Sequence, residues 1–231
     1  LDSRALAPLQ FNDRLVWNQH EHRVQAFVEV HPWLTLYGGH AYLTGDAQVR
    51  RAELSSGPPL DSGALRRHSA LAGLAFTPHS RLSLHADSEV GRGDRTWFRT
   101  SLQNYEQLRL RGRYQLRDRW FLQSRFQRLA NANAGLAFRN QQAGLGLQYI
   151  APKLSVMADY TRSTIFSDID YLDPVLYRPQ RSLYRDNAHS GTLTVDLQLP
   201  RQATLTAGGS LFRSAGSRPS RFYQPLLRLR V

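Results

Sequence analysis

The chain has 231 residues, of which 41% are hydrophobic, and a formal net charge of +12 at pH 7. This length predicts one domain, or part of one, over residues 1–231. The sequence contains no cysteine, which excludes disulfides, thiolate zinc sites and covalent c-type haem attachment. It also has no run of 18 apolar residues, which excludes a transmembrane helix but not a membrane β-barrel, because barrel strands alternate and produce no long apolar run.

Alternating apolar and polar residues predict strands along most of the chain. In chain order we expect strands at 20–30, 33–45, 66–76, 81–89, 104–116, 119–129, 138–150, 154–163, 188–199, 203–213 and 222–231. Residues 1–18 are otherwise unassigned, with a further strand expected at Phe11–Trp17. No helical crossover pattern separates these strands, so the predicted topology is an antiparallel up-and-down meander.

Short turns and long connections alternate between the strands. The short turns are expected at Val30–Trp33, Thr77–Ser80, Leu116–Arg119, Ala151–Lys153 and Leu199–Gln202. The long connections are expected at 45–65, 89–103, 129–138, 164–188 and 213–221. Because each strand crosses once, all short turns fall at one end and all long loops at the other, as in an outer-membrane barrel.

Each predicted strand has one apolar and one polar face. Around the turn at Leu116, Leu108, Leu110 and Tyr114 share one face, whereas the other carries arginines and glutamines. Strands of about 10–12 residues match the ~9–11 needed to cross a bilayer at a tilt. Trp33, Tyr114, Trp120, Tyr149 and Tyr160 are expected beside the short turns, where an interfacial aromatic girdle would lie.

These features predict an all-β, antiparallel transmembrane β-barrel of about 10–12 strands in a bacterial outer membrane, in contact with its lipid. The alternative is a soluble all-β binding module with a basic, anion-binding face. The chain ends in an apparent strand with Val231 as its last residue, and the predicted strand count is odd, whereas bacterial single-chain barrels have even counts. The chain is therefore expected to be a fragment of a larger barrel, unless one strand is miscounted.

The polar face of the central hairpin carries the candidate site. Charged side chains facing lipid at mid-depth cost ~2–4 kcal/mol each, so in a barrel these residues must face the lumen. Arginine binds phosphate and carboxylate groups through two hydrogen bonds at once. The predicted lumen-facing, anion-binding residues are Arg109, Arg111, Arg113, Arg125, Gln123 and Gln127. The alternative is that these arginines pair with Asp159, Asp196 or Glu106 for structure alone.

Other chemistries are less well supported by the sequence. The arginines form no single run and accompany no recognition helix or zinc finger, so no nucleic-acid partner is expected. His20 and His22 share a strand face, and Asp168, Asp170 and Asp173 could hold calcium, but neither set has a complete ligand pattern. No Gly-x-Ser-x-Gly or phosphate-binding loop occurs, so we expect no enzyme activity, no metal site and no cofactor.

Three segments carry a family resemblance. They are Phe98–Tyr114, Asp159–Thr164 and Ser182–His189. They are similar to the barrels of porin–cytochrome conduits, and the resemblance covers residues 25–231. It implies a wide barrel that acts as a pore, or as a sheath for a partner such as a multihaem cytochrome that carries the haem chemistry. Those barrels have well over twenty strands and some have a cysteine pair near the start, and this chain has neither.

Overall fold

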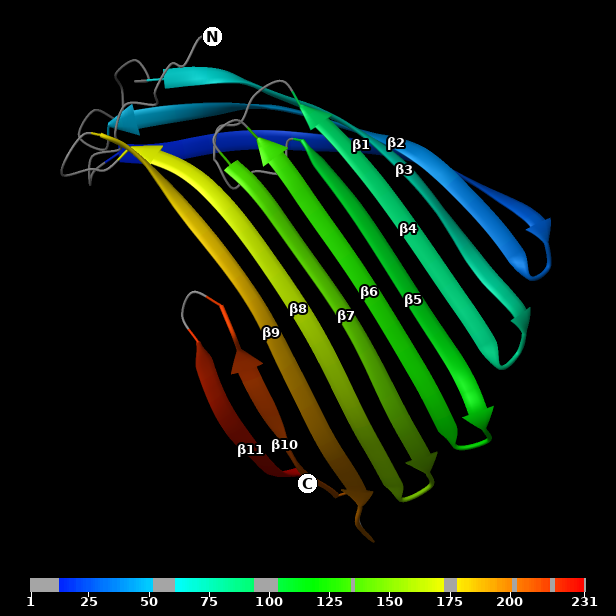
Figure 1. Cartoon of the computed structure of the whole chain (residues 1–231). Coiled ribbons are helices and arrows are strands. Elements are labelled where there is room, and N and C mark those ends of the chain that lie inside the picture. The colour runs from blue at the N-terminus through cyan, green and yellow to red at the C-terminus, as the bar shows by residue number, and fades with distance from the viewer. Residues whose placement is uncertain are drawn as a thin grey trace.

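The computed structural model describes residues 13–51, 61–93, 104–133, 136–172, 178–200, 203–216 and 219–230. They form one antiparallel sheet in which eleven strands follow each other in sequence order (Figure 1). The strands are β1 (Asp13–His31), β2 (Leu34–Arg51), β3 (Asp61–His79), β4 (Leu82–Gly93), β5 (Tyr105–Arg117), β6 (Trp120–Asn133), β7 (Leu136–Ala151), β8 (Leu154–Leu172), β9 (Pro179–Gln198), β10 (Thr204–Ser214) and β11 (Ser220–Arg230). The predicted all-β meander and its eleven strands are confirmed.

Several strands are longer than the sequence predicts. β8 and β9 stay paired from Leu154 opposite Leu197 to Leu172 opposite Pro179. Most of the predicted loop at 164–188 is therefore strand, and so is much of the predicted loop at 45–65. The sequence analysis ended these strands where the apolar alternation stops, but backbone pairing continues through polar residues. The strand expected at Phe11–Trp17 is the start of β1 from Asp13 onward, and Phe11 lies outside the described residues.

The short turns lie together at one end of the sheet, as predicted (Figure 1). One turn differs in position. The second hairpin turns at Ser80 and Arg81 rather than at 77–80, because the pairing shifts register between Phe76 and His79. At this end the ring centres of Trp33 and Phe76 lie 5.4 Å apart in an edge-to-face arrangement, and the ring centres of Trp120 and Tyr149 lie 5.0 Å apart. Tyr160 instead lies seven residues beyond the turn at Lys153, so its expected place beside the turns is wrong.

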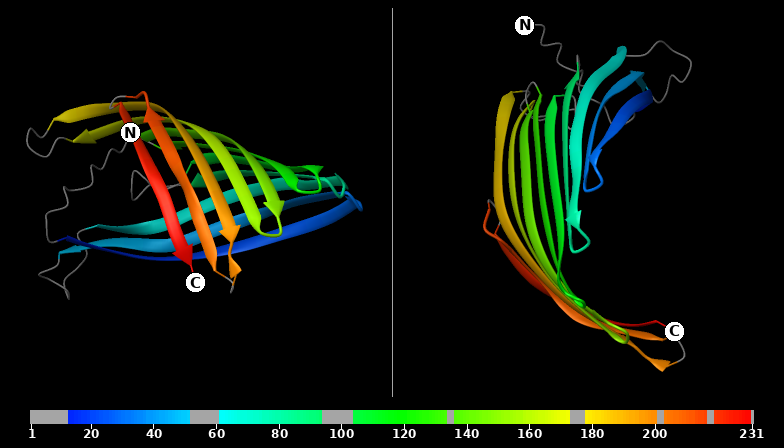
Figure 2. Two further views of the ribbon diagram at one scale, coloured as in Figure 1. Left: turned by 90° about the horizontal axis from the view of Figure 1, so that it is seen from below. Right: turned by 90° about the vertical axis from the view of Figure 1, so that its right-hand side faces the viewer.

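The sheet curves strongly (Figure 2). Contacts between side chains of strands two positions apart place its polar face on the concave side. Side chains on this face reach across to strands two positions away, as Tyr105 of β5 does to Ser69 of β3. The buried side chains lie on the same face, among them Ala41, Ser69 and Tyr105, which are 2%, 1% and 4% exposed. The opposite face exposes large apolar residues such as Leu145 and Leu193, which are 52% and 51% exposed.

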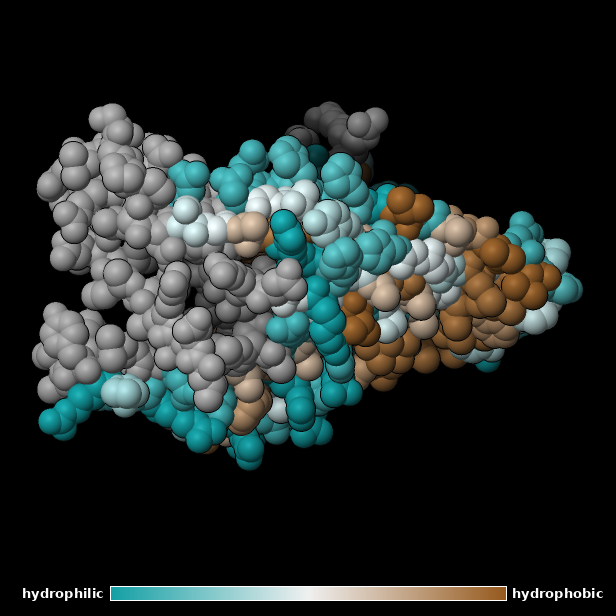
Figure 3. All heavy atoms as spheres, turned by 90° about the horizontal axis from the view of Figure 1, so that it is seen from above, coloured by the Kyte–Doolittle hydropathy of each residue, from teal (hydrophilic) through white to brown (hydrophobic). Residues whose placement is uncertain are grey.

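The exposed apolar residues form a continuous band next to the turn end. Figure 3 shows this band with hydrophilic side chains on both of its borders. On the outward face of three strands, for example, it consists of Leu145, Leu147 and Tyr149 in β7, Val156 and Ala158 in β8, and Leu193, Val195 and Leu197 in β9. Nine strand residues, as from Leu82 to Val90 in β4, rise about 23 Å at ~3.3 Å each and a tilt of ~40°, which is close to the ~25 Å height of the lipid-facing band of membrane barrels.

The sheet is open among the described residues. β1 pairs only with β2, and β11 pairs only with β10, so each leaves one edge without a strand partner in this part of the chain. Within the same residues, no helix is long and apolar enough to cross a membrane. This is the architecture of an antiparallel transmembrane β-barrel, of which the described residues form an open sector. The apolar band faces outward, the strands are long enough to cross a bilayer, and the short turns all lie at one end.

Candidate lumen-facing site

The six residues predicted from the sequence all lie on the concave face of one hairpin. In the β5–β6 register, Arg111 is opposite Arg125, Arg113 is opposite Gln123, and Arg109 is opposite Gln127. Their apolar neighbours Leu110 and Tyr114 point outward and are each 40% exposed. The structure thus places these side chains on the inner face, while their anion-binding role stays a prediction.

Arginines surround a shallow hollow in the centre of the inner face. It has a volume of about 350 Å³ and is lined by Arg111, Arg113 and Arg125 together with His85, Gln123 and Asp159. Two glycines of β7, Gly144 and Gly146, also line it. Because these residues have no side chain, the floor of the hollow is backbone and the long arginine side chains lie across it.

Two of the four arginines form ion pairs. Arg125 donates to a carboxylate oxygen of Asp159 at 2.6 Å and to the Thr161 hydroxyl at 2.7 Å. Arg111 donates to Asp87 of β4 at 3.2 Å. The arginine side chains remain 60% and 67% exposed, and exposed pairs of this kind contribute only ~0–1 kcal/mol to stability.

The structural pairing considered from the sequence is therefore only partly realised. Asp159 does hold Arg125. Asp196 instead accepts a hydrogen bond from Thr206 at 2.6 Å, and Glu106 pairs with Arg92 on the outer face. Asp87, which the sequence analysis did not single out, is the partner of Arg111.

The other two arginines form no ion pair within the described residues. The guanidinium of Arg113 lies 4.5 Å from the centre of the Phe121 ring, an arrangement that holds the side chain without neutralising it. Arg109 lines a second hollow of about 210 Å³ together with Arg23, Arg111 and Asp87. This part of the inner face therefore presents more positive than negative charge to whatever occupies the space in front of it.

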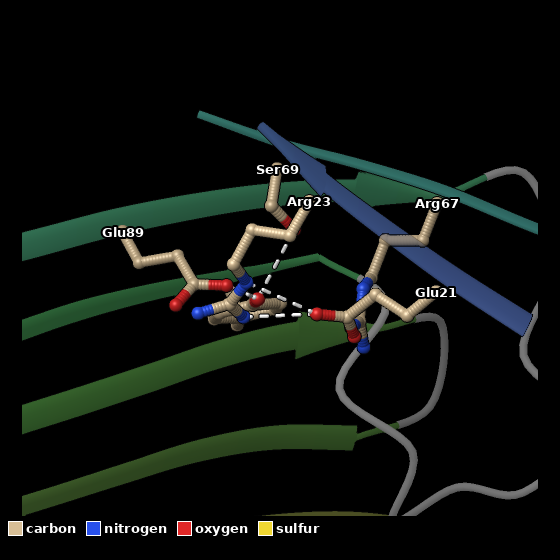
Figure 4. Close-up of polar contacts among 6 residues, drawn as sticks. Glu21, Arg23, Arg67, Ser69 and Glu89 are labelled. Atoms are coloured by element: carbon tan, nitrogen blue, oxygen red, sulfur yellow. Dashed lines mark hydrogen bonds and ion pairs between the residues drawn. The ribbon is translucent and has the colours of Figure 1, made fainter. Parts of the chain in front are cut away.

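A second polar network lies nearer the loop end of the same face, and the sequence analysis missed it. Figure 4 shows the side chains of Glu21, Arg23, Arg67, Ser69 and Glu89 directed toward one another. Glu21 of β1 accepts hydrogen bonds from Arg23 at 2.9 Å and from Arg67 of β3 at 3.5 Å. The contact between Glu21 and Arg67 joins β1 to β3, which are not neighbours in the sheet, and so depends on its curvature.

Tyr105 is the centre of this network. Its hydroxyl lies 3.1 Å from the Ser69 hydroxyl and donates to Glu89 of β4. The guanidinium of Arg67 lies 5.3 Å from the centre of the Tyr105 ring. Because the ring is buried and its hydroxyl is satisfied, Tyr105 ties β3, β4 and β5 together on the inner face.

Glycines on the intervening strands make room for these cross-strand contacts. A Cβ at Gly91 would lie 2.2 Å from the Tyr105 ring, and a Cβ at Gly144 would lie 2.6 Å from Nε of Arg125. Tyr105 and Arg125 can therefore lie flat across the sheet and reach a strand two positions away. Gly191, in contrast, has nothing within 4 Å of the place where a Cβ would be.

We expect Gly91→Ala to destabilise the protein by ~1–3 kcal/mol, because the added methyl group displaces a buried, hydrogen-bonded ring. The matched control Gly191→Ala should leave stability unchanged or raise it by up to ~1 kcal/mol, since alanine restricts the unfolded chain. Both values are measured as free energies of unfolding in denaturant. Equal effects of the two substitutions would contradict the conclusion that Gly91 leaves space for the Tyr105 ring.

The carboxylates considered for calcium binding do not converge on one site among the described residues. Asp168 lies in the loop-end extension of β8, beyond the apolar band. It accepts two hydrogen bonds from Arg181, one of them from Nε at 2.6 Å. This pairing lowers the pKa of Asp168. Asp170 is opposite Arg181 in the register, and Asp173 lies outside the described residues. This arrangement is an ion pair that supports the extended hairpin.

The histidine pair considered for metal binding lies on the outward face. His22 is opposite Tyr42 and His20 is opposite Thr44, whereas Glu21 between them points inward. Within the part of the chain that the structure describes, no three metal-ligating side chains come together. His40 and His68 contact each other at 3.1 Å between ring nitrogens, as a pair without a third ligand in that part of the chain.

No protein-family profile and no curated protein matches the sequence. Solved structures do match the fold. The siderophore receptor PirA from Acinetobacter baumannii aligns with a TM-score of 0.59 at 10% identity, over 93% of this chain and 38% of the receptor. The ferric enterobactin receptor PfeA from Pseudomonas aeruginosa, as a G324V mutant, aligns with a TM-score of 0.53 at 12% identity, over 94% of this chain and 41% of the receptor. This chain thus spans about two fifths of the length of these receptors, and it shares the fold of outer-membrane β-barrels.

Proposed function

We propose that this chain is a sector of a bacterial outer-membrane β-barrel that acts as a pore or transport barrel. The observation that carries the proposal is the division of charge between the faces. On the outward face, and apart from Arg117 at the turn itself, the band next to the turns has no Asp, Glu, Lys or Arg at its described positions on the eleven strands. A face in contact with lipid must be free of charge, whereas the charged face opposite to it can line a water-filled lumen.

The inner face supports a preference for anions. Arg109 and Arg113 have no carboxylate partner in the described part of the chain, and they lie beside the paired Arg111 and Arg125. Rings or clusters of arginine in a confined space favour anions, because the surrounding protein and narrow water layer screen the charges weakly. We therefore infer that anionic solutes pass or bind along the β5–β6 hairpin.

Within the described residues β1 and β11 do not pair with each other, so this sheet does not close on itself. Unpaired backbone groups at the outer edges of β1 and β11 would be costly in hydrocarbon, so both edges need partners in the membrane. The two receptors have more than twice the length of this chain. Further strands of a longer barrel are the partners that we propose for these edges.

The second candidate function is a sheath for a partner protein, such as a multihaem cytochrome. Three arginines of the inner face favour this function, because they could pair with acidic groups on a protein inside the barrel. The guanidinium of Arg111 is exposed, and Arg109 and Arg113 have no carboxylate partner among the described residues. The resemblance of the sequence to porin–cytochrome barrels points in the same direction. In this case the lumen would be filled and would not conduct ions.

Conductance in planar lipid bilayers tests the proposed function. The full protein should insert from detergent and carry a current that is larger for anions than for cations. Insertion without current, together with co-purification of a second protein, would favour the sheath. A protein that stays in solution without detergent and does not insert would contradict both functions.

The position of the two sheet ends gives a separate prediction. Because the chain has no cysteine, single substitutions Asp170→Cys and Asp118→Cys give unique labelling sites. We expect Asp170→Cys at the loop end to react with a membrane-impermeant maleimide on intact cells, and Asp118→Cys at the turn end to react only after permeabilisation. The reverse pattern would contradict the assigned orientation.

A further inference from the structure

A row of arginines lies on the outward face, next to the apolar band on the side of the long loops. We name this the outer arginine belt; its members are Arg92, Arg128, Arg139, Arg162, Arg213 and Arg221. Arg128 lies nine residues beyond Arg119 at the turn of its hairpin, and Arg162 lies nine residues beyond Lys153. Strands of a barrel share one tilt, so residues at similar distances from the turns lie at similar heights. The belt therefore marks the loop-side border of the apolar band.

The belt concentrates like charges without matching acids. Arg213 is directly opposite Arg221 on one side and His189 on the other, and His189 is opposite Arg162. Like charges placed directly across a strand pair destabilise a sheet. Among the described residues, the only carboxylate that pairs with a belt arginine is Glu106, which contacts Arg92 at 3.4 Å. An anion from outside the chain would remove this repulsion.

Two further observations place that anion at a lipid–water border. The Nε of Arg128 is buried and has no hydrogen-bond partner among the described residues, so one donor of the belt is left unsatisfied there. Tyr160 is the outward residue next to Arg162 in β8, and Tyr223 is the outward residue next to Arg221 in β11, and both lie on the apolar side of the belt. Tyrosine with its ring in the apolar region and its hydroxyl at the headgroups is typical of membrane interfaces.

We propose that the outer arginine belt binds the phosphate groups of lipid headgroups in the leaflet on the loop side. Phosphate accepts two hydrogen bonds from one guanidinium, and each basic residue at an anionic surface strengthens membrane binding several-fold. The proposal rests on the membrane location given under the proposed function. It differs from the lumen site because the belt points away from the concave face.

Lipid retention in native mass spectrometry tests the proposal. The full protein, purified in non-ionic detergent, is incubated with lipid A, which carries two phosphates, with dephosphorylated lipid A, or with phosphatidylglycerol. The belt variant carries Arg128→Gln, Arg162→Gln, Arg213→Gln and Arg221→Gln. Its matched control carries Arg109→Gln, Arg111→Gln, Arg113→Gln and Arg125→Gln on the inner face, so both variants lose four positive charges.

We expect the wild type and the inner-face control to retain lipid A, and the belt variant to retain at least ~tenfold less, because each of its four lost arginines strengthens binding several-fold. Retention of lipid A but not phosphatidylglycerol would assign the phosphates to lipopolysaccharide, and retention of both would assign them to any phosphorylated lipid. Equal retention of dephosphorylated lipid A, or equal losses in the two variants, would overturn the proposal. A protein that is soluble without detergent would instead overturn the proposed membrane function, so the two failures are distinguishable.

Discussion

We expect Leu193→Arg to lower the free energy of unfolding in lipid vesicles by ~2–4 kcal/mol. Leu193 lies on the outward face of β9, six residues before the turn at its end, and the residue is 51% exposed. In a membrane this exposed surface faces hydrocarbon, where a guanidinium loses its hydration. In a soluble protein the same position would face water, and the substitution would have little effect.

The neighbouring residue provides the control. Thr192 is also exposed and lies at the same depth, but it points to the concave face opposite Asp159 and Ser210. Thr192→Arg should change stability by no more than ~0.5 kcal/mol, because its guanidinium stays in water near a carboxylate. Denaturant unfolding of both variants in vesicles measures the difference, and equal small effects would rule out lipid on the outward face.

The sequence contained enough information for the strands and their two faces. Side chains alternate with a period of two, so Leu108 and Leu110 had to lie opposite Arg109 and Arg111 once a strand was assumed. The cost of charge in lipid then decided which face is inward. The strand ends were harder to predict, because β8 and β9 continue beyond the lipid through polar residues such as Thr164 and Asn187. Backbone pairing holds them there, without an apolar pattern.

The inner networks show what the sequence could not provide. Alternation places Glu21 on the face opposite His20 and His22, so its inward direction was predictable. Its contact with Arg67 was not, because that contact spans two strands and depends on register and curvature. The reach of Tyr105 to Ser69 likewise requires that Gly91 faces inward on the strand between them. A glycine opposite a large residue on the inner face is the sequence signal that could have predicted the contact between Tyr105 and Ser69.

The second large effect that we expect concerns ion selectivity. Replacing Arg111 and Arg113 with glutamine should lower the ratio of anion to cation permeability about threefold or more. Two effects add in the same direction. The hollow loses two positive charges, and Asp87 loses its partner Arg111 and then presents a negative charge to the lumen. Glutamine is already present beside this site at Gln123, so the fold should remain intact.

Reversal potentials in planar bilayers under a salt gradient measure this ratio. The matched control is Arg139→Gln with Arg162→Gln, which removes two positive charges from the outward face and should leave the ratio unchanged. If the barrel sheathes a partner, no current flows, and the inner-face variant should instead weaken co-purification of that partner. If the inner-face variant changes neither the permeability ratio nor the retention of a partner, the arginines of the β5–β6 hairpin are structural, because charge in a lumen must act on whatever occupies it.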